Sequence, residues 1–156
     1  MGKEIISIEE LHKEIDLIQA CINRMSNNSF LLKGWMVSII AIIVALSPEE
    51  LDKFVVVMTL IMVTISFWYL DAFFLRTEKL YKKLYGWVLE KRNQGEKDFQ
   101  YDLNPHRFDN EVESAVQVMF STTLKWFYGV ICLIIVIIGL YFWGSDILKL
   151  ICSCRK

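Results

Sequence analysis

The sequence predicts an all-α membrane protein with three transmembrane helices, because it is rich in apolar residues and these residues gather in three long runs. Of its 156 residues, 54% are hydrophobic and 22% are charged, a composition too apolar for a soluble domain of this size unless the apolar residues cluster. They cluster in residues 30–46, 54–75 and 126–143. Each run is close to the roughly 20 residues that a helix needs to cross the hydrocarbon of a bilayer.

The three runs divide the chain into five segments. We expect residues 1–29 to form a cytoplasmic amphipathic helix, 30–75 a transmembrane hairpin, 76–125 a cytoplasmic helix and loop, 126–144 the third transmembrane helix, and 145–156 a C-terminal tail. Positively charged segments stay in the cytoplasm, and most Lys and Arg residues precede the first run or follow the second. The N-terminus is therefore expected in the cytoplasm. The basic tail then lies on the far side, unless one run is re-entrant.

The N-terminal segment has the pattern of an amphipathic helix. Ser7 and Glu10 have the spacing of a capping box. Apolar residues follow at alternating spacings of three and four, which is typical of a heptad seam: Ile8, Leu11, Ile15, Ile18, Ile22 and Met25. Two interpretations remain open, a short coiled coil and packing against the helix that follows Arg76 in the same chain.

The link between the first two runs predicts a helical hairpin. Ser47 is a candidate N-cap and Pro48 suits the first helical position. Counted from this turn at 1.5 Å per residue, Lys33 lies roughly 21 Å along one helix and Asp71 roughly 27 Å along the other. Charged side chains near hydrocarbon usually face a partner or water, so an ion pair is one prediction. The alternative places Asp71 among the lipid headgroups beside Arg76.

Small residues repeat with a three-four spacing along the first span. Such residues let membrane helices approach closely, and here they are Gly34, Ser38, Ala41 and Ala45. Packing against the second span is the first expectation. A pore-lining or subunit-contact face is the alternative.

The second span is expected to continue into the cytoplasm as a basic helix. Residues 76–92 contain six basic and two acidic side chains. Lys and Arg often extend toward lipid headgroups from such positions. The alternative is a site that binds a polyanion, formed by Lys79, Lys82, Lys83, Lys91 and Arg92.

The remaining segments are a loop and the third span. Residues 93–113 form the one substantial loop, in which Gly95 and Asn104-Pro105 are turn signals and short extended pieces are allowed. Aromatic and basic side chains are expected to anchor the third span at the membrane interfaces: Lys125, Trp126 and Tyr128 at one, Tyr141 and Trp143 at the other.

The sequence lacks the motifs of the common enzyme classes. It contains no phosphate-binding glycine loop, no nucleophile elbow and no zinc-protease helix. Its two histidines and four cysteines have no metal-ligand spacing. We therefore expect no catalysis, no cofactor and no metal, which leaves conduction, sensing and assembly as candidate functions.

Two stretches of the chain resemble the signature blocks of a family of small bacterial membrane proteins. They are RMSNNSFLLKGW, residues 24–35, and FWYLDAFFLRTEKLYKKLY, residues 67–85. The family comprises Hailong-type ion channel effectors of anti-phage defence islands, which occur beside nucleotidyltransferases. The resemblance covers about residues 20 to 90, and the third span is similar only in architecture.

The resemblance implies a homo-oligomeric ion channel, a tetramer, in the bacterial inner membrane. The pore would stay shut until infection and then open to depolarise the host. A nucleotide or oligonucleotide made by the partner nucleotidyltransferase would control the gate, with Lys33, Asp71 and Arg76 as the ion-pair or gating residues. The rival hypothesis is a non-conducting scaffold or accessory subunit that binds another membrane protein.

Overall fold

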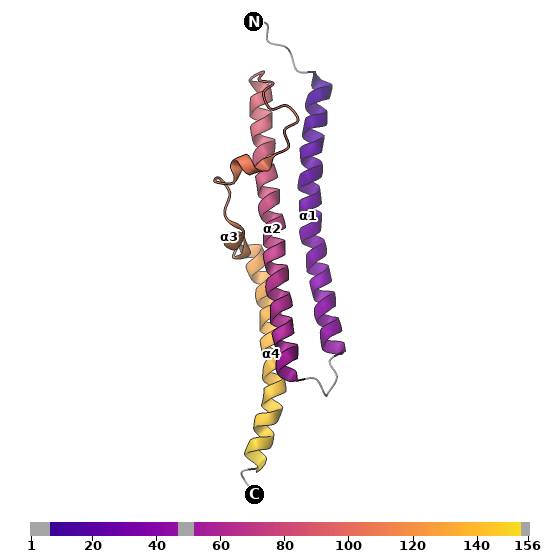
Figure 1. The fold of residues 1–156 in the computed structure, drawn as a ribbon, viewed down its shortest axis with the longest axis vertical. Coiled ribbons are helices and arrows are strands. Elements are labelled where there is room, and N and C mark those ends of the chain that lie inside the picture. Colours follow the sequence, from indigo (N-terminus) through magenta and orange to yellow (C-terminus); the bar gives the residue numbers. More distant parts are fainter. Residues whose placement is uncertain (1–6, 47–51, 154–156) are drawn as a thin grey trace.

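The described part of the chain folds into three long helices and two short ones. The computed structural model describes residues 7–46 and 52–153, with side chains described up to residue 144. Helix α1 spans Ile8–Ala45, α2 spans Lys53–Asn93 and α4 spans Thr122–Ser153. Figure 1 shows α1 and α2 lying antiparallel along their lengths, with α4 beside the lower part of α2. Helix α2 is therefore the central element of the bundle.

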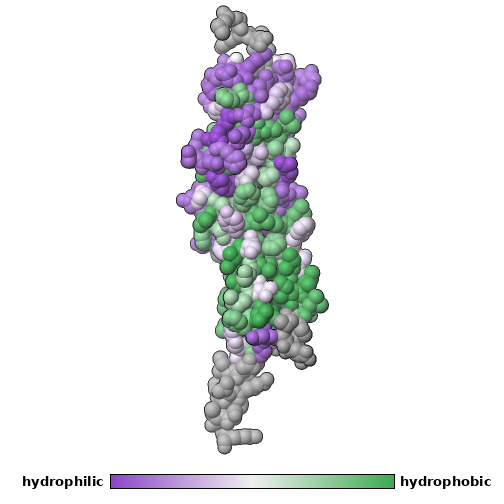
Figure 2. Space-filling view, in the orientation of Figure 1, coloured by the Kyte–Doolittle hydropathy of each residue, from purple (hydrophilic) through white to green (hydrophobic). Residues whose placement is uncertain are grey.

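Both helices of the hairpin are longer than a bilayer is thick. The 38 residues of α1 and the 41 of α2 extend about 60 Å, roughly twice the thickness of the hydrocarbon core. Figure 2 shows a hydrophobic lower half and a hydrophilic upper half, which we call the apolar half and the polar half. Three of the described helices are long and apolar enough to cross a membrane, so the chain is an all-helical protein suited to a lipid bilayer.

Side-chain caps define where the hairpin helices begin. Ser7 accepts a hydrogen bond from the backbone N–H of Glu10, whose carboxylate accepts one from the N–H of Ser7, so the predicted capping box is confirmed. Helix α2 begins at Lys53, where the Asp52 carboxylate accepts from the N–H of Phe54 at 3.0 Å. The predicted cap at Ser47 and Pro48 lies outside the described residues.

The heptad seam of α1 packs against α2 in the polar half. Ile18 is completely buried in a cluster with Leu80, Leu84, Val88 and Phe108. The structure thus supports packing within the chain. Ile22 of the seam packs against the same cluster, whereas Ile8, the first residue of the seam, is 74% exposed.

In the apolar half, α1 continues the same seam toward α2. Met36 is buried there, and Ile40 and Ile43 pack against the same core. The small residues lie on other sides of the helix and all four are exposed: Gly34, Ser38, Ala41 and Ala45. The expected packing of these residues against the second span is wrong, because the seam of larger side chains occupies that contact and buries more apolar surface.

The loop after α2 folds back along that helix. It contains the 3-10 helix η1, Pro105–Phe108, and is followed by the short helix α3, Ala115–Met119. Asn104 caps η1 by accepting from the N–H of His106 at 3.1 Å, as its turn signal suggests. Residues 94–114 are fully described and contain no strand, so the extended pieces that the sequence allowed do not form. The loop instead lies along α2 (Figure 1), where Asp109, Glu111 and Glu113 pair with basic side chains of that helix.

Candidate functional site

Asp71 lies in the centre of the bundle although it is a charged residue. It is completely buried on α2, on the helical face that also carries Thr64, Trp68 and Leu75. Their spacing of three and four residues places these side chains on one stripe, and this stripe faces the neighbouring helices. A lone carboxylate in such surroundings costs several kcal/mol, so its partners decide whether the arrangement is stable.

Three side chains from two other helices converge on the Asp71 carboxylate. Nζ of Lys33 lies 2.6 Å from Oδ2, the hydroxyl of Ser29 donates to Oδ1 at 2.5 Å, and the hydroxyl of Tyr128 lies 3.1 Å from Oδ2. Ser29 and Lys33 are four residues apart on α1 and therefore share a face, while Tyr128 comes from α4. We call Ser29, Lys33, Asp71 and Tyr128 the polar cluster. The ion pair that the depth argument predicted is present, and its role in gating stays a prediction.

Aromatic rings enclose the polar cluster. The indole of Trp68 stacks on the ring of Tyr128 with centroids 5.3 Å apart, and its Nε1 donates to the carbonyl of Met119 at 2.8 Å. Nζ of Lys33 also lies 5.9 Å from the centroid of the Phe127 ring. Tyr128 was expected as an interface anchor, and this expectation is wrong because the side chain is completely buried.

Arg76 does not contact Asp71. Its Nη2 lies 2.8 Å from Oδ1 of Asp109 in the loop, and its Nε donates to the carbonyl of Glu113 at 3.0 Å. The alternative that placed Asp71 beside Arg76 is therefore wrong, since the guanidinium faces the loop that folds along α2. Desolvation acts to raise the pKa of Asp109, but hydrogen bonds from Arg76 and His106 outweigh it and hold the pKa below its usual value.

Four of the five predicted polyanion residues are surface lysines with a carboxylate nearby. The distances between nitrogen and oxygen are 2.6, 2.5, 3.5 and 2.8 Å for Lys79 with Glu113, Lys82 with Glu78, Lys83 with Glu111, and Lys91 with Glu96. Such exposed pairs contribute little to stability. The four lysines therefore remain at a surface that a polyanion could reach.

Arg92 is different, because it is buried in the polar half. Its Nε and Nη2 each lie 2.9 Å from an oxygen of Glu14 on α1, and the N–H of Tyr101 donates to the same carboxylate at 2.9 Å. Burial acts to raise the pKa of Glu14, but the hydrogen bonds from Arg92 and Tyr101 outweigh it and the pKa is lowered. Both partners have only 1% of their side chains exposed, so the expected polyanion contact of Arg92 is wrong.

A pocket of about 580 Å³ opens beside the polar cluster. It lies between α1, α2 and the beginning of α4, at the boundary between the apolar and polar halves. We call it the basic pocket, because its charged lining consists of three lysines and one glutamate: Lys33, Lys79, Lys82 and Glu78. Five hydroxyl groups also line it: Ser26, Ser29, Ser121, Thr122 and Thr123. Lys33 thus belongs to both the basic pocket and the polar cluster.

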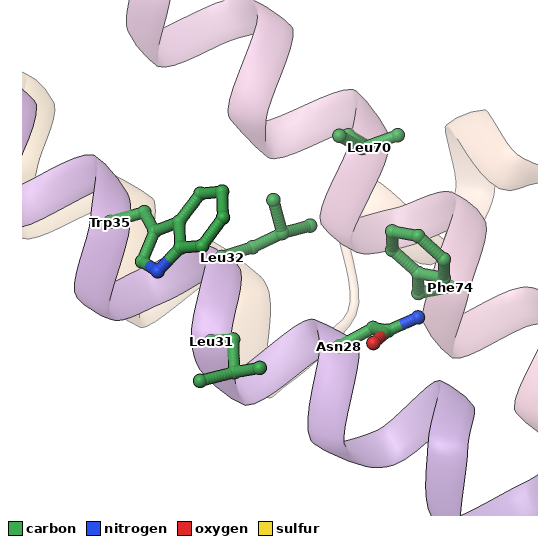
Figure 3. A pocket seen from close by; sticks show the side chains of 6 residues that line it. All are labelled: Asn28, Leu31, Leu32, Trp35, Leu70 and Phe74. Atoms are coloured by element: carbon green, nitrogen blue, oxygen red, sulfur yellow. The ribbon is translucent and has the colours of Figure 1, made fainter.

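A second, smaller pocket lies between α1 and α2 and is mostly apolar. Its volume is about 290 Å³, and Figure 3 shows Leu31, Leu32 and Trp35 on α1 near Leu70 and Phe74 on α2, with the amide of Asn28 at one end. No charged side chain lines it. The pocket therefore offers space for an apolar group but no means of binding an ion.

Comparisons with family models, with curated proteins and with solved structures found no match. Among the described residues, no group of three or more His, Cys, Asp or Glu side chains could hold a metal ion. The assignment of function therefore depends on the polar cluster and the surfaces around it.

The sequence predicted two members of the polar cluster and missed the other two. Lys33 and Asp71 were found by counting depth from the turn. Ser29 was detectable as the residue four positions before Lys33, which places both on one face. Tyr128 gave no such signal, because a tyrosine near the end of an apolar run also suits a membrane interface.

Proposed function

We propose that this protein is the subunit of a homo-oligomeric ion channel in the bacterial inner membrane, with its N-terminus in the cytoplasm. In this proposal the channel opens during phage infection and depolarises the host. A nucleotide or oligonucleotide from a partner nucleotidyltransferase controls the gate. The observation that carries the proposal is the buried ion pair of Lys33 and Asp71, at which α1, α2 and α4 meet.

The physical argument begins with the cost of burying charge. A buried ion pair is often no more stable than apolar side chains of the same volume, and ionisable residues within membrane spans generally mark functional positions. Here the carboxylate of Asp71 contacts one residue of α4 and two of α1. A change in the pairing of Asp71 would therefore alter the contacts between all three helices, which is what a gate requires.

The arrangement also joins the two stretches that resemble the effector family. Ser29 and Lys33 belong to the first stretch and Asp71 to the second. The contact between Ser29 and Asp71, which are 42 residues apart in sequence, and the ion pair of Lys33 with Asp71 bring the two stretches together at one location. This supports a shared function for them in the proposed channel.

A non-conducting scaffold is the second candidate, and the exposed small residues of α1 provide the contact surface that it requires. The ideal Cβ position of Gly34 has no neighbouring atom within 4 Å, and Ser38, Ala41 and Ala45 are exposed on the same helix. Such surfaces allow close approach of another membrane helix. That helix would belong to a second copy in the channel and to a different protein in the scaffold.

Currents across planar bilayers distinguish the two candidates. Purified protein is reconstituted, its insertion and oligomeric state are verified, and currents are recorded with and without an added oligonucleotide. Discrete currents that the oligonucleotide changes, and whose open probability differs in the Asp71→Asn variant, would support a gated channel. Inserted oligomers that remain silent under both conditions would favour the scaffold.

A further inference from the structure

We infer that the basic pocket binds the phosphate group of a ligand, either a phospholipid headgroup or a soluble phosphate compound such as a nucleotide. This inference deepens the proposed function, because it assigns a location to the regulatory ligand, and only its consequence for gating rests on that proposal. The phosphate binding itself is independent of whether the protein conducts ions.

The lining of the basic pocket has the chemistry of a phosphate site. Lys33 extends from α1, whereas Lys79 and Lys82 extend from α2, so three ammonium groups from two helices surround one space. Glu78 supplies the one carboxylate of the lining, which leaves a net charge of plus two. Ammonium groups form charge-assisted hydrogen bonds with phosphate oxygens. The Ser29 hydroxyl donates to Asp71, and the hydroxyls of the other four serine and threonine residues of the lining provide further donors.

The pocket also lies where helix α4 begins. The hydroxyl groups of Thr122 and Thr123 line it, and these are the first residues of a helix of 32 residues. The first N–H groups of a helix have no partner within the helix, and its N-terminus carries a partial positive charge. This contribution adds to the charge of the three lysines.

A bound phosphate would compete with carboxylates of the chain for these lysines. The present partners of Lys33, Lys79 and Lys82 are Asp71, Glu113 and Glu78. Lys33 has 21% of its side chain exposed, whereas Asp71 has none, so the ammonium group is accessible to a ligand and the carboxylate is not. Phosphate binding would therefore draw Lys33 away from Asp71 and change the polar cluster directly.

The location of the pocket makes both sources of phosphate accessible. Its α1 residues surround the start of the first apolar run, and its α2 residues follow the end of the second. This level corresponds to the headgroup region of a bilayer. A lipid phosphate would arrive from the side, and a soluble phosphate from the aqueous phase.

Binding measurements on the full-length protein test the inference. The protein is incorporated in phosphatidylcholine nanodiscs and titrated with adenosine diphosphate by calorimetry. In a second arm, native mass spectrometry measures how much phosphatidylglycerol the protein retains from mixed lipid. The variant K79Q/K82Q removes two charges from the pocket, and K13Q/K97Q removes two charges from the far end of the polar half as a matched control. The side chains of Lys13, Lys79 and Lys82 are 43% to 65% exposed, and Lys97 is partly exposed in the loop, so both variants should fold.

We expect K79Q/K82Q to weaken binding roughly tenfold or more, equivalent to about 1.4 kcal/mol, since glutamine forms a weaker hydrogen bond with phosphate than the charged ammonium group that it replaces. The control should change binding less than about twofold. If K79Q/K82Q binds adenosine diphosphate more weakly but retains phosphatidylglycerol, the ligand is a soluble phosphate compound. If it retains less phosphatidylglycerol but binds adenosine diphosphate normally, the ligand is a lipid. Equal effects of the two variants, or no binding of either probe to the parent protein, would overturn the inference. None of these results depends on channel currents.

The variant Asp71→Asn tests the competition for Lys33. It keeps the size of the side chain but removes the charge that holds the ammonium group. Phosphate probes should bind to it more tightly than to the parent protein. Unchanged or weaker binding by a folded variant would show that Lys33 does not take part in the pocket.

Discussion

At the scale of single residues, the described part of the molecule is organised around the two carboxylates that are almost completely buried, those of Asp71 and Glu14. Asp71 is paired with Lys33 in the apolar half, and Glu14 is paired with Arg92 in the polar half. Each carboxylate also accepts hydrogen bonds from other groups, so neither charge is left without compensation. The two pairs differ in access, because only Lys33 is open to a pocket.

The first prediction concerns the stability of the Asp71 pair. Asp71→Ala should lower the free energy of unfolding by about 3 kcal/mol, the lower end of the range for breaking a buried pair, because Lys33 can still reach pocket water. Lys33→Met combined with Asp71→Leu should recover much of this loss, since no charge remains buried and Tyr128 can donate to the carbonyl of Phe67, 3.2 Å away. Unfolding in detergent, followed by circular dichroism, measures both. A double variant as unstable as Asp71→Ala would contradict the prediction.

The second prediction concerns the dependence of stability on pH. The pKa of Glu14 is lowered in the folded protein, so its ionised form stabilises the fold above its usual value of 4.5, and this stabilisation is lost as the pH falls through the folded pKa. Glu14→Gln should therefore be less stable at neutral pH and lose less stability on acidification. The free energy of unfolding of both proteins is measured between neutral pH and a pH of about 3. An equal loss of stability in parent and variant over this range would contradict the prediction.

A matched variant separates this effect from the loss of any carboxylate on α1. Glu9 forms an exposed pair with Lys13, in which 80% of the Glu9 side chain is accessible. Glu9→Gln should change the free energy of unfolding by less than about 1 kcal/mol, as is typical of surface ion pairs.

At the scale of elements, hydrophobic periodicity predicted the helices well. The three runs, the capping box at Ser7 and the continuation of the second span all correspond to observed helices. The face that each helix buries was harder to predict. Gly34, Ser38, Ala41 and Ala45 formed a regular pattern, yet the contact with α2 is made by the larger side chains of Met36, Ile40 and Ile43. The spacing of residues along a helix shows which side chains share a face. Which other helix packs against that face depends on the tertiary structure.

The candidate site illustrates the same limit. Lys33 and Asp71 could be paired because the hairpin turn fixes their relative depth. The position of α4 is not fixed in this way, since 28 residues separate it from α2. Tyr128 therefore could not be connected with Asp71 before the structure was known.

The third prediction tests the packing of α1 on α2 in the polar half. Ile18→Ala should destabilise the protein by about 2 to 4 kcal/mol, because it leaves a cavity in a buried cluster. The neighbouring variant Leu17→Ala is the control, since Leu17 is 45% exposed and its truncation should cost about 0.5 kcal/mol or less. Thermal unfolding in detergent compares the two. Similar midpoints would indicate that the seam does not stabilise the hairpin.

At the scale of the whole molecule, the hairpin connects the apolar half with the polar half. Helices α1 and α2 run without interruption through both halves. In the polar half, the loop and the pair of Arg92 with Glu14 hold α1 and α2 together. In the apolar half, the polar cluster joins α1, α2 and α4. A ligand between them, in the basic pocket, would act at the boundary where the two halves join.

The fourth prediction concerns assembly. If the exposed small residues of α1 contact a second copy, Gly34→Leu should shift the purified protein toward monomers, because the larger side chain prevents close approach. Gly129→Leu is the matched control, since a Cβ atom at either glycine would meet no other atom within 4 Å. Light scattering coupled to size-exclusion chromatography in detergent measures the mass of each. If both variants shift to monomers to the same extent, or if neither does, the face of α1 that carries Gly34 is not the contact between copies.

The stacking of Trp68 on Tyr128 gives the protein an optical signal of its own. The two rings are inclined by only 4° to each other and come from α2 and α4, so their overlap exists only while these helices stay together. Indole fluorescence depends on contact with neighbouring rings and on the polarity of the surroundings. Separation of α4 from α2 would therefore change the emission of Trp68. Helix movement could be followed without an added label in a variant whose other four tryptophans are replaced by phenylalanine.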